Sequence, residues 1–551
     1  MRDEEEFSFW HVLVRDVSYQ QIPRAARGQK HVEAAEWIEH ASEGRLSDHA
    51  EFLAHHYAQA LELGRAAGET KNHVEVEERL VRFSVLAGDR AMGLDIPAAE
   101  AAYRRALATV ADAAQRANIL VKLGDALQPQ GLLVESEAAY EEAIPALRAA
   151  GENRGAGIAM VTLGRALWRR GETLRAREVS ADAVALLEAD PGSDLVLAYG
   201  RMAAIDALGG RSEEAVAWAN KAIELASELR FENVTRALGM RGVARLDLGD
   251  PGGMEDVRSA VELALELNLP AEDTAIAMGN LGENVGLTES VARGREQIEA
   301  GLEYARSRGH THHVVYSRTS LLWHLFHEGR WDELLREAVE LIEWDRDRGG
   351  TQLELWALSD YAKVLVHRGK ATNAADALSV ALPRAREVAD PQTVLPLLVS
   401  AAVAAYVQDD LRRAGALLDE YEASSGGIRM AVDREISVWL TIVALGVDGI
   451  DRAERLLSYE PWTACGRHAL SHGRALVAEA AGRPGEAAEL FAEAADGWNV
   501  WGSVPLRAYA LLGLGASSGD AKALAESEAI FAGLGATPVT GLARRAPQQQ
   551  V

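Results

Sequence analysis

A repeated unit of two predicted helices is the feature of this sequence that most constrains its fold. The unit is clearest at residues 157–188, where an apolar-periodic stretch containing Leu163 and Gly164 ends at Gly171 and a second periodic stretch follows. Apolar residues spaced three or four apart predict an amphipathic helix, and a glycine that interrupts the pattern predicts a turn. Because one such pair cannot bury its apolar face alone, these pairs are expected to stack on one another.

Glycines at the predicted turns recur at steps of 40, 39, 39, 80 and 40 residues, at Gly131, Gly171, Gly210, Gly249, Gly329 and Gly369. The double step contains one further unit, in which Glu289 takes the place of the glycine. Small residues stand five positions after the turn and again twelve after it, at Ser136, Ala176, Ala215 and Ala374 and at Ala143, Ala183, Ala222 and Ala381. Small side chains at these positions of the second helix allow the two helices to approach closely.

This order of residues resembles the tetratricopeptide repeat, which also has Leu-Gly in its first helix, glycine at the turn and small residues in its second helix. The usual period of that repeat is ~34 residues, so the helices here are expected to be longer. The resemblance implies an all-α fold, a right-handed superhelix (α-solenoid) of about ten to twelve helix pairs. The length agrees, because 551 residues exceed one ordinary core whereas the core of a solenoid grows lengthwise.

Five parts are predicted along the chain. They are a remnant of a winged-helix junction, linking helices, tetratricopeptide-like repeats, degenerate repeats and a frayed tail, at residues 1–40, 41–75, 76–423, 428–543 and 544–551. The sequence SSGG at 424–427 is the best internal break between the two repeat regions. In the later units Asp409 and Asp448 stand at turn positions, which indicates that the repeat pattern degrades toward the carboxy end.

The first part carries a pattern of its own, formed by Phe7, Phe9, His11, Arg15, Asp16 and Tyr19. Phe7 and Phe9 alternate as in a short strand, and two short helices are expected on either side of Pro23. The pattern resembles the end of the winged-helix segment that follows the ATPase module in signal-transduction ATPases of the STAND class. In actinobacteria such proteins are often fused to adenylate/guanylate cyclase or LuxR-type DNA-binding domains. The resemblance implies that this chain corresponds to their carboxy-terminal sensor region.

The catalytic parts of that family are missing from the sequence. A phosphate-binding loop requires Gly-x-x-x-x-Gly-Lys-Ser/Thr, and its closest approach, Gly369-Lys370-Ala371, lacks the hydroxyl residue. A cyclase domain needs strands with paired metal-binding aspartates, and almost no strand-like sequence follows residue 10. We therefore predict that the chain is not an enzyme and holds no cofactor.

The charge of the chain bears on its partners and its location. A formal net charge of −26 opposes binding to phosphate backbones, and the carboxy end has no basic recognition helix, so a transcription factor acting directly on DNA is disfavoured. No apolar run reaches the ~18–20 residues that span a bilayer. The acidic start does not resemble a secretory signal. We expect a cytoplasmic protein without direct contact with nucleic acid or membrane.

The sequence contains one tight cluster of histidines, formed by His310, His312 and His313, and a metal site is one interpretation of it. Zinc needs three or four converging ligands, and side chains two positions apart on a helix point away from each other. The favoured interpretation is a polar loop that leads into a first helix, so no metal site is predicted. The single cysteine, Cys465, excludes an intramolecular disulfide and is interpreted as a semi-buried helix residue.

The concave wall of a superhelix of this kind is lined chiefly by the first helices of its pairs. Alignment of the units on their turns places aromatic and basic side chains on this wall, at Arg165, Trp168, Arg169, Tyr316, Trp323, His327, Trp356, Lys363 and His367. Aromatic and basic residues in a groove are typical of binding sites. The alternative is that the tryptophans fill gaps between repeats, because aromatic residues are also common in cores.

These observations predict a non-catalytic scaffold or sensor module for protein–protein or ligand recognition in signalling or transcriptional regulation. The expected partner is a protein or peptide, for which an ATPase or cyclase module on another chain is one candidate, and a small ligand is the other class. The alternative is that the sequence is the carboxy-terminal fragment of a cyclase or ATP-dependent regulator whose catalytic half would precede Met1.

Overall fold

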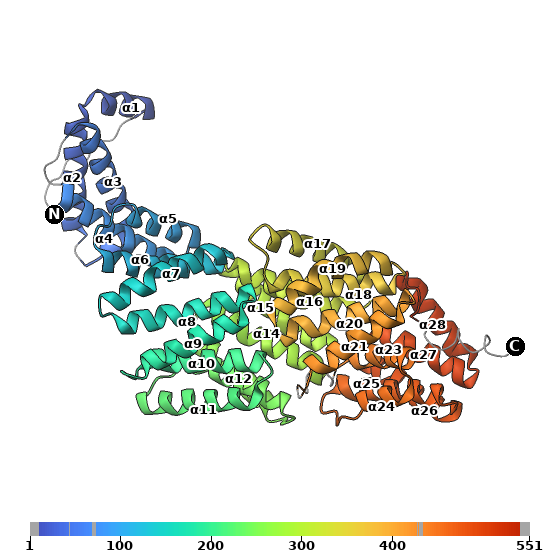
Figure 1. Cartoon of the computed structure of the whole chain (residues 1–551). Helices are drawn as coiled ribbons and strands as arrows, with labels where there is room; N and C mark the ends of the chain where they lie inside the picture. Colours follow the sequence, from blue (N-terminus) through green and yellow to red (C-terminus); the bar gives the residue numbers. More distant parts are fainter. Residues whose placement is uncertain (1–9, 43, 69–72, 427, 429–433, 540–551) are drawn as a thin grey trace. The chain divides into compact units, whose positions relative to one another are not determined.

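The structure is a computed structural model that describes residues 10–42, 44–68, 73–426, 428 and 434–539. In these ranges every regular element is a helix and no strand occurs (Figure 1). The chain divides into two compact units, which are described separately. The first comprises Met1–Gln130 and Glu135–Ala159, and the second comprises Gly131–Val134 and Met160–Val551.

The first unit packs its helices around a small core. Its elements are α1 (Val12–Gln21), α2 (Arg24–Ala41), η1 (Leu46–His49), α3 (Ala50–Ala66), α4 (His73–Ala91), α5 (Ile96–Leu107), α6 (Ala113–Leu127), η2 (Gln128–Gln130) and α7 (Leu133–Ala149). Tyr57 of α3 stacks on Phe83 of α4, with ring centroids 5.8 Å apart. Asp95 and Asp112 start α5 and α6 by accepting hydrogen bonds from backbone N–H groups of the first turn, as N-cap residues do.

The second unit is a continuous series of helix pairs. After α8 (Asn153–Arg170), which begins in the first unit, its helices are α9 (Thr173–Leu187), α10 (Ser193–Leu208), α11 (Ser212–Leu229), α12 (Thr235–Asp247), α13 (Gly253–Glu266), α14 (Ala271–Thr288), α15 (Val291–Ser307), α16 (Thr311–His327), α17 (Trp331–Arg346), α18 (Gln352–His367), α19 (Ala371–Val388), α20 (Pro391–Val407), α21 (Leu411–Ser424), α23 (Ile436–Val447), α24 (Ile450–Leu456), α25 (Ala464–Ala480), α26 (Pro484–Trp501), α27 (Val504–Ser518) and α28 (Ala521–Leu534). The described residues hold twelve pairs, α4/α5, α6/α7 and ten from α8/α9 to α27/α28. The predicted all-α solenoid is confirmed.

The turns between paired helices follow the predicted pattern. All six predicted turn glycines have positive φ angles, between 70° and 86°, a backbone conformation that glycine adopts without steric cost. Asp409 takes the same conformation at its turn, with φ 64°. In the next pair Gly449, with φ 89°, takes the left-handed position in place of the predicted Asp448, whose φ is −118°. The predicted turn there was wrong by one residue.

Small residues let the two helices of a pair approach each other. A Cβ atom on Gly164 of α8 would lie 2.3 Å from the Ser180 hydroxyl of α9, and one on Gly282 of α14 would lie 2.5 Å from Ile298 of α15. The two sets of small residues predicted on the second helices, exemplified by Ala176 and Ala183, are fully buried. The Leu-Gly element and these small residues therefore set the packing distance within a pair.

Turns of early pairs in the second unit contact pairs much later in the chain. The nearest contacts of a Cβ on Gly171, Gly210 or Gly329 would be Val388, Ile428 and Leu534, respectively. Each contact joins a pair to one five pairs further along. The solenoid therefore closes on itself after about five pairs and encloses its inner side.

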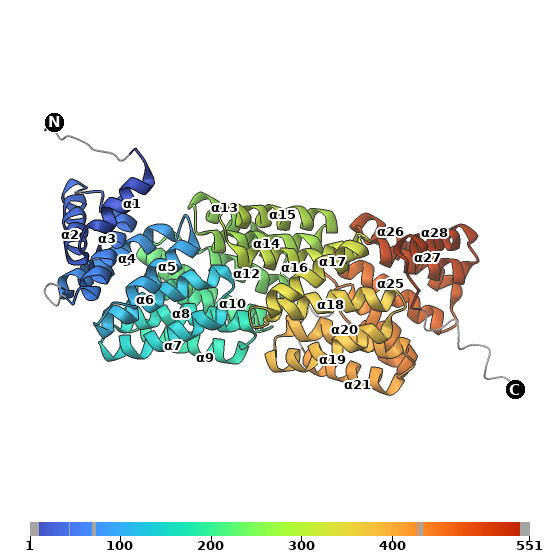
Figure 2. The ribbon, with the colours of Figure 1, turned by 90° about the horizontal axis from the view of Figure 1, so that it is seen from above.

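The first helices of the pairs lie on that inner side. In Figure 2, α13 and α15 run along an outer edge of the second unit, with α12, α14 and α16 inside them. α20 and α23 are buried along almost their whole length, because first helices are covered on several sides. None of the helices in the described ranges combines the length and the apolar character needed to cross a bilayer.

Candidate functional site

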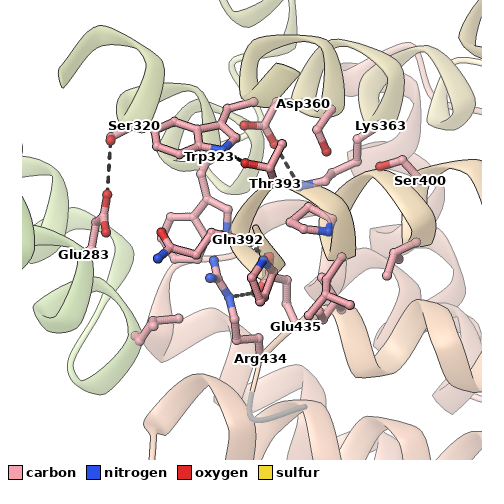
Figure 3. Close-up of a pocket in the computed structure, with 18 of the residues that line it drawn as sticks. Glu283, Ser320, Trp323, Asp360, Lys363, Gln392, Thr393, Ser400, Arg434 and Glu435 are labelled. Atoms are coloured by element: carbon pink, nitrogen blue, oxygen red, sulfur yellow. Dashed lines mark hydrogen bonds and ion pairs between the residues drawn. The ribbon is translucent and has the colours of Figure 1, made fainter. Parts of the chain in front are cut away.

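The first helices of successive pairs enclose a cavity of about 280 Å³ in the second unit. Its wall includes side chains of α10, α12, α14, α16, α18, α20 and α23. We call it the inner cavity, and its principal lining residues are Glu283, Tyr316, Ser320, Trp323, Trp356, Asp360, Lys363, Thr393, Arg434 and Glu435. Figure 3 shows that the labelled side chains, which include Glu283, Trp323 and Lys363, come from several helices and converge on one space.

Trp323 and Glu435 join α16 to the segment that precedes α23. The Trp323 indole Nε1 donates a hydrogen bond to Glu435 Oε1 at 2.8 Å. Arg434 lies beside both groups, with its guanidinium carbon 5.8 Å from the Trp323 ring centroid and its Nε 3.6 Å from Glu435 Oε2. The three side chains therefore form one wall of the inner cavity in which an aromatic face and opposite charges are held together.

Arg434 and Glu435 stay ionised because of the groups that surround them. Burial alone would raise the pKa of Glu435, but the Arg434 charge and the nearby His327 outweigh burial and hold this pKa below its ordinary value. Burial acts in the opposite direction on Arg434, whose pKa is nevertheless raised by the Glu435 charge. Both groups are therefore charged at neutral pH, in a position where only 2% of the Glu435 side chain is exposed.

Trp356 of α18 is fixed in a similar way on the neighbouring wall. Its indole Nε1 donates to the Thr393 hydroxyl at 2.9 Å, and that hydroxyl donates to Gln352 Oε1 at 3.3 Å. The Tyr316 ring packs edge-on against the indole, with centroids 5.7 Å apart. Both tryptophans are thus held by hydrogen bonds at their polar edge, which leaves their apolar surface to shape the cavity.

Lys363 and Asp360 form a second charged pair on α18. Lys363 Nζ lies 2.9 Å from Asp360 Oδ1, and both side chains are largely buried, with 13% and 14% exposed. The Lys363 ammonium also lies 4.9 Å from the centroid of the Phe326 ring. A cation over an aromatic face is attracted by the ring, so Lys363 is held by two interactions.

Glu283 of α14 differs from the other acids because it presents free surface to the inner cavity. It accepts a hydrogen bond from the Ser320 hydroxyl at 3.2 Å. The protein around the cavity partly desolvates the carboxyl and raises its pKa, against the smaller effects of Ser320 and Arg434. Glu283 is therefore suited to a ligand that donates hydrogen bonds or carries a positive charge.

The structure brings five of the predicted groove residues to the inner cavity, namely Tyr316, Trp323, Trp356, Lys363 and His367. His327 lies behind Trp323 and is fully buried, with Nδ1 2.9 Å from the Ser503 hydroxyl. His367 is 2% exposed and its Nδ1 lies 3.0 Å from the Tyr509 hydroxyl. These two histidines mainly join α16 and α18 to α27, so the carboxy-terminal pairs are part of the support of the cavity.

The other three predicted groove residues, Arg165, Trp168 and Arg169 of α8, are not among the lining residues of the inner cavity. Arg165 Nη1 and Arg169 Nη2 lie 2.7 Å and 2.8 Å from the same oxygen, Oε1 of Glu272. The Trp168 carbonyl accepts a hydrogen bond from the Gln352 side chain at 2.6 Å. The structure therefore places Arg165 and Arg169 in a separate cluster with α14, whereas Trp168 contacts α18.

The histidine segment is not the polar loop that the sequence predicts. His310 is the N-cap residue of α16, His312 and His313 lie in its first turn, and the three are 5%, 2% and 3% exposed. His310 Nε2 lies 3.9 Å from Glu272 Oε2. The prediction was wrong because polar composition does not reveal that the neighbouring first helices cover this helix start.

The single cysteine and the possible metal ligands lie as follows in the structure. Cys465 is fully buried in α25, with its Sγ 3.9 Å from Glu435 Oε2. Throughout the part of the chain that the structure describes, no three His, Cys, Asp or Glu side chains are grouped so as to hold a metal ion.

The residues of the amino-terminal pattern lie on or before α1. Phe7 and Phe9 fall outside the described residues, and the His11 ring caps α1 by accepting a hydrogen bond from the Leu13 N–H at 3.2 Å. Arg15 and Asp16 form an exposed ion pair at 2.8 Å, and the Tyr19 hydroxyl lies 2.8 Å from His31 Nε2. Two helices meet at Pro23 as expected, although α2, at 18 residues, is longer than the short helix predicted.

Sequence reasoning missed several lining residues of the inner cavity. Asp360 could have been found, because it lies one helical turn before Lys363 on the same first helix. Glu283 also occupies a first helix and faces inward. Arg434 and Glu435 could not have been found in this way, because they follow the SSGG break and lie outside any repeat register.

Comparison with known proteins agrees with the repeat architecture. Residues 115–189, which span α6 to α9, match the model of the tetratricopeptide repeat family. No curated protein matches the sequence. The fold and this match define a helical-repeat protein of the tetratricopeptide type.

Several solved structures are similar to parts of this chain. A Rap protein complexed with competence and sporulation factor is 14% identical, with 73% of this chain and 99% of that chain covered and a TM-score of 0.42. The Cut9–Hcn1 hetero-tetramer of APC/C is 13% identical, with coverage of 83% and 85% and a TM-score of 0.43. Yeast Tom70 is 13% identical, with coverage of 77% and 92% and a TM-score of 0.32.

Proposed function

We propose that this chain is a non-catalytic recognition module that binds a short peptide segment of a protein partner in the inner cavity. The observation that carries the proposal is a cavity of about 280 Å³ that two fixed indoles and two charged pairs line. Binding sites commonly combine an apolar wall with a few placed polar groups. A peptide supplies apolar side chains for Trp323 and Trp356 and N–H donors for Glu283.

The proposal is tested with a peptide-display library and the full chain. Replacing Ser320 by Phe (S320F) fills the inner cavity from α16, whereas S379F adds the same ring to the exposed face of α19. We expect peptides selected on the unaltered chain to bind S379F equally and S320F at least about tenfold more weakly, because the ring occupies their space. Calorimetry measures the affinities, and circular dichroism verifies that both variants fold. Equal affinity for both variants would show that peptides bind elsewhere.

A second candidate function is suggested by the exposed apolar face of α1. No residue of α1 is buried, and Trp10, Val12, Leu13, Val14 and Val17 are each more than half exposed. Apolar patches of this kind often contact a partner. With the resemblance of the same segment to a STAND junction, this favours a regulatory role as the sensor of an ATPase or cyclase module.

This second candidate is tested by affinity purification from the cells that make the protein. Material captured by the intact chain is expected to hydrolyse ATP or to form a cyclic nucleotide, and a chain with Leu13→Glu and Val17→Glu is expected to capture neither activity. The charges would prevent burial of the α1 face. Captured material without either activity would exclude the ATPase or cyclase assignment.

A further inference from the structure

A second cluster of polar side chains lies on the inner side of the second unit, apart from the lining of the inner cavity. It is formed where the first helices α8, α10, α12, α14 and α16 come together. We call it the arginine–histidine cluster, and it comprises Arg165, Arg169, Arg201, Arg236, Glu272, His310, His312 and His313. Cationic residues are thus concentrated at one internal place of a chain whose net charge is −26.

Part of this positive charge is compensated within the protein. Glu272 accepts both Arg165 and Arg169 on one oxygen, at 2.7 Å and 2.8 Å. Arg236 Nη2 lies 2.6 Å from Asp273 Oδ1. These ion pairs fix the guanidinium groups in place, because a buried arginine held by a carboxylate loses little further freedom when it binds a second group.

Arg201 and the histidines show a different pattern. Arg201 is only 7% exposed, and its Nε has no hydrogen-bond partner among the described residues. The same holds for both ring nitrogens of His313 and for Nδ1 of His310 and of His312. Buried polar atoms in folded proteins are nearly always hydrogen-bonded, so several unsatisfied atoms in one cluster indicate a group that binds there.

The electrostatics show what sign of charge this group would have. Burial lowers the pKa of Arg201 well below its ordinary value, and the Arg236 and Arg165 charges lower it further. Burial also lowers the pKa of His312 and of His313, so both rings are neutral at pH 7 and each carries one N–H donor. The cluster therefore presents donors and excess positive potential near Arg201, which an anion would satisfy.

We propose that the arginine–histidine cluster binds a compact oxyanion of the phosphate class. Guanidinium groups match phosphate oxygens with pairs of parallel N–H donors, and the imidazole N–H groups add donors from another helix. A tetrahedral phosphate offers several oxygens, so it can accept from donors on both α10 and α16. This inference does not depend on peptide binding in the inner cavity.

The phosphate can come from two sources, and the structure connects both to the cluster. Arg165 and Arg236 keep 19% and 14% of their side chains exposed, which gives a free ion partial access. His313 also stacks on Tyr316, with centroids 6.0 Å apart, and Tyr316 lines the inner cavity. A phosphorylated ligand could therefore place its phosphate at the cluster and its body in the cavity.

Calorimetry on the full chain tests this proposal, with inorganic phosphate and phenyl phosphate as probes and sodium chloride of equal ionic strength as the reference. Both probes are expected to bind the unaltered chain. Arg201→Met is expected to weaken both at least about tenfold, because it removes a charged hydrogen-bond donor. Arg258→Met, which changes an exposed arginine of α13, is expected to leave both unchanged. Tighter binding of phenyl phosphate would identify a phosphorylated ligand as the source, and equal binding would identify the free ion.

Two further variants keep the result unambiguous. His313→Leu removes both unsatisfied ring nitrogens and is expected to weaken phosphate binding even if Arg201→Met does not fold. S320F fills the inner cavity and is expected to bind inorganic phosphate normally, so failure of the peptide proposal and failure of this one can be distinguished. The inference is overturned if neither probe binds beyond the chloride reference, or if Arg201→Met and His313→Leu bind phosphate as the unaltered chain does.

Discussion

The inner cavity and the arginine–histidine cluster are both built from inward faces of first helices, yet their buried charges are paired to different degrees. In the cavity, Trp323 and Arg434 contact Glu435, and Lys363 contacts Asp360. In the cluster, Arg201 forms no ion pair with a carboxylate of the described residues, and its Nε has no hydrogen-bond acceptor there. A wall whose charges are paired is held in place before a ligand arrives, whereas a buried guanidinium without a carboxylate gains its partner from the ligand.

The difference also has an origin in the repeat itself. The cavity lies where the segment before α23 enters the inner side and brings Arg434 and Glu435 to Trp323 of α16 and near the charged pair of α18. The cluster lies among earlier pairs, and its acids come mainly from the start of α14, at Glu272 and Asp273. An irregular segment can thus supply complementary charges that regular repeats do not.

The largest effect is expected from removing Glu435, the carboxylate that both Trp323 and Arg434 contact in the wall of the inner cavity. Glu435→Ala leaves Arg434 without its nearest carboxylate and the Trp323 N–H without its acceptor, so we expect a loss of about 3–5 kcal/mol in local stability. Hydrogen exchange of α16 and α23 measures this loss, because repeat proteins open in parts. Glu435→Gln keeps an acceptor for the Trp323 N–H and is expected to lose less local stability than Glu435→Ala. A loss below about 1 kcal/mol for Glu435→Ala would contradict the view that this wall holds the helices together.

The second effect concerns pH and belongs to the cluster. The unfolded chain takes up a proton at His313 below its ordinary pKa of 6.5, whereas burial keeps the folded ring neutral. The folded state keeps its full free energy of unfolding above pH 6.5. Below that pH the unfolded state gains stability by binding the proton, so the free energy of unfolding falls by about 1.4 kcal/mol per pH unit for each such histidine. His313→Leu is expected to reduce the total slope between pH 6.5 and 5 by the share of one histidine, while other buried histidines such as His312 and His472 keep theirs.

Urea unfolding at several pH values measures this dependence. His11→Leu, which changes an exposed histidine of the first unit, serves as the matched control and is expected to keep the slope of the unaltered chain. An unchanged slope in His313→Leu would mean that the ring gains its proton in the folded state as easily as in the unfolded one. The cluster would then hold a charged ring, and the contrast with the cavity would have to be revised.

The regular part of this architecture could be predicted from the sequence. Gly171 and Gly329 mark turns because only glycine adopts their positive φ angles without steric cost, and Ala176 and Ala183 mark helix contacts, where both are fully buried. The inward direction of the first helices follows from the same periodicity. Trp323 therefore reached the inner cavity as the alignment of units indicated.

The irregular part could not be predicted, for physical reasons. Closure of the solenoid joins pairs that are five pairs apart, and such contacts depend on small rotations that add up along the stack. The burial of His313 and the meeting of Arg169 with Glu272 both result from this long-range packing. Sequence periodicity describes neighbours within a pair and between adjacent pairs, so it assigned Arg169 to the same groove as Trp323.

The smallest expected change in stability is that of Arg201→Met. Replacing a buried arginine usually destabilises a protein, whereas this replacement is expected to be nearly neutral or stabilising. Arg201→Met replaces an incompletely bonded guanidinium by an apolar side chain of similar length, and we expect stability without phosphate to change by less than about 1 kcal/mol, or to rise. Arg386→Ala on α19, which removes an exposed ion pair with Glu420, should cost about 0.5 kcal/mol and provides the scale. Hydrogen exchange of α10 and α19 in phosphate-free buffer measures both changes. If Arg201→Met instead cost as much as Glu435→Ala, Arg201 would be a structural residue with full partners, and its unsatisfied Nε would no longer indicate a place for an anion.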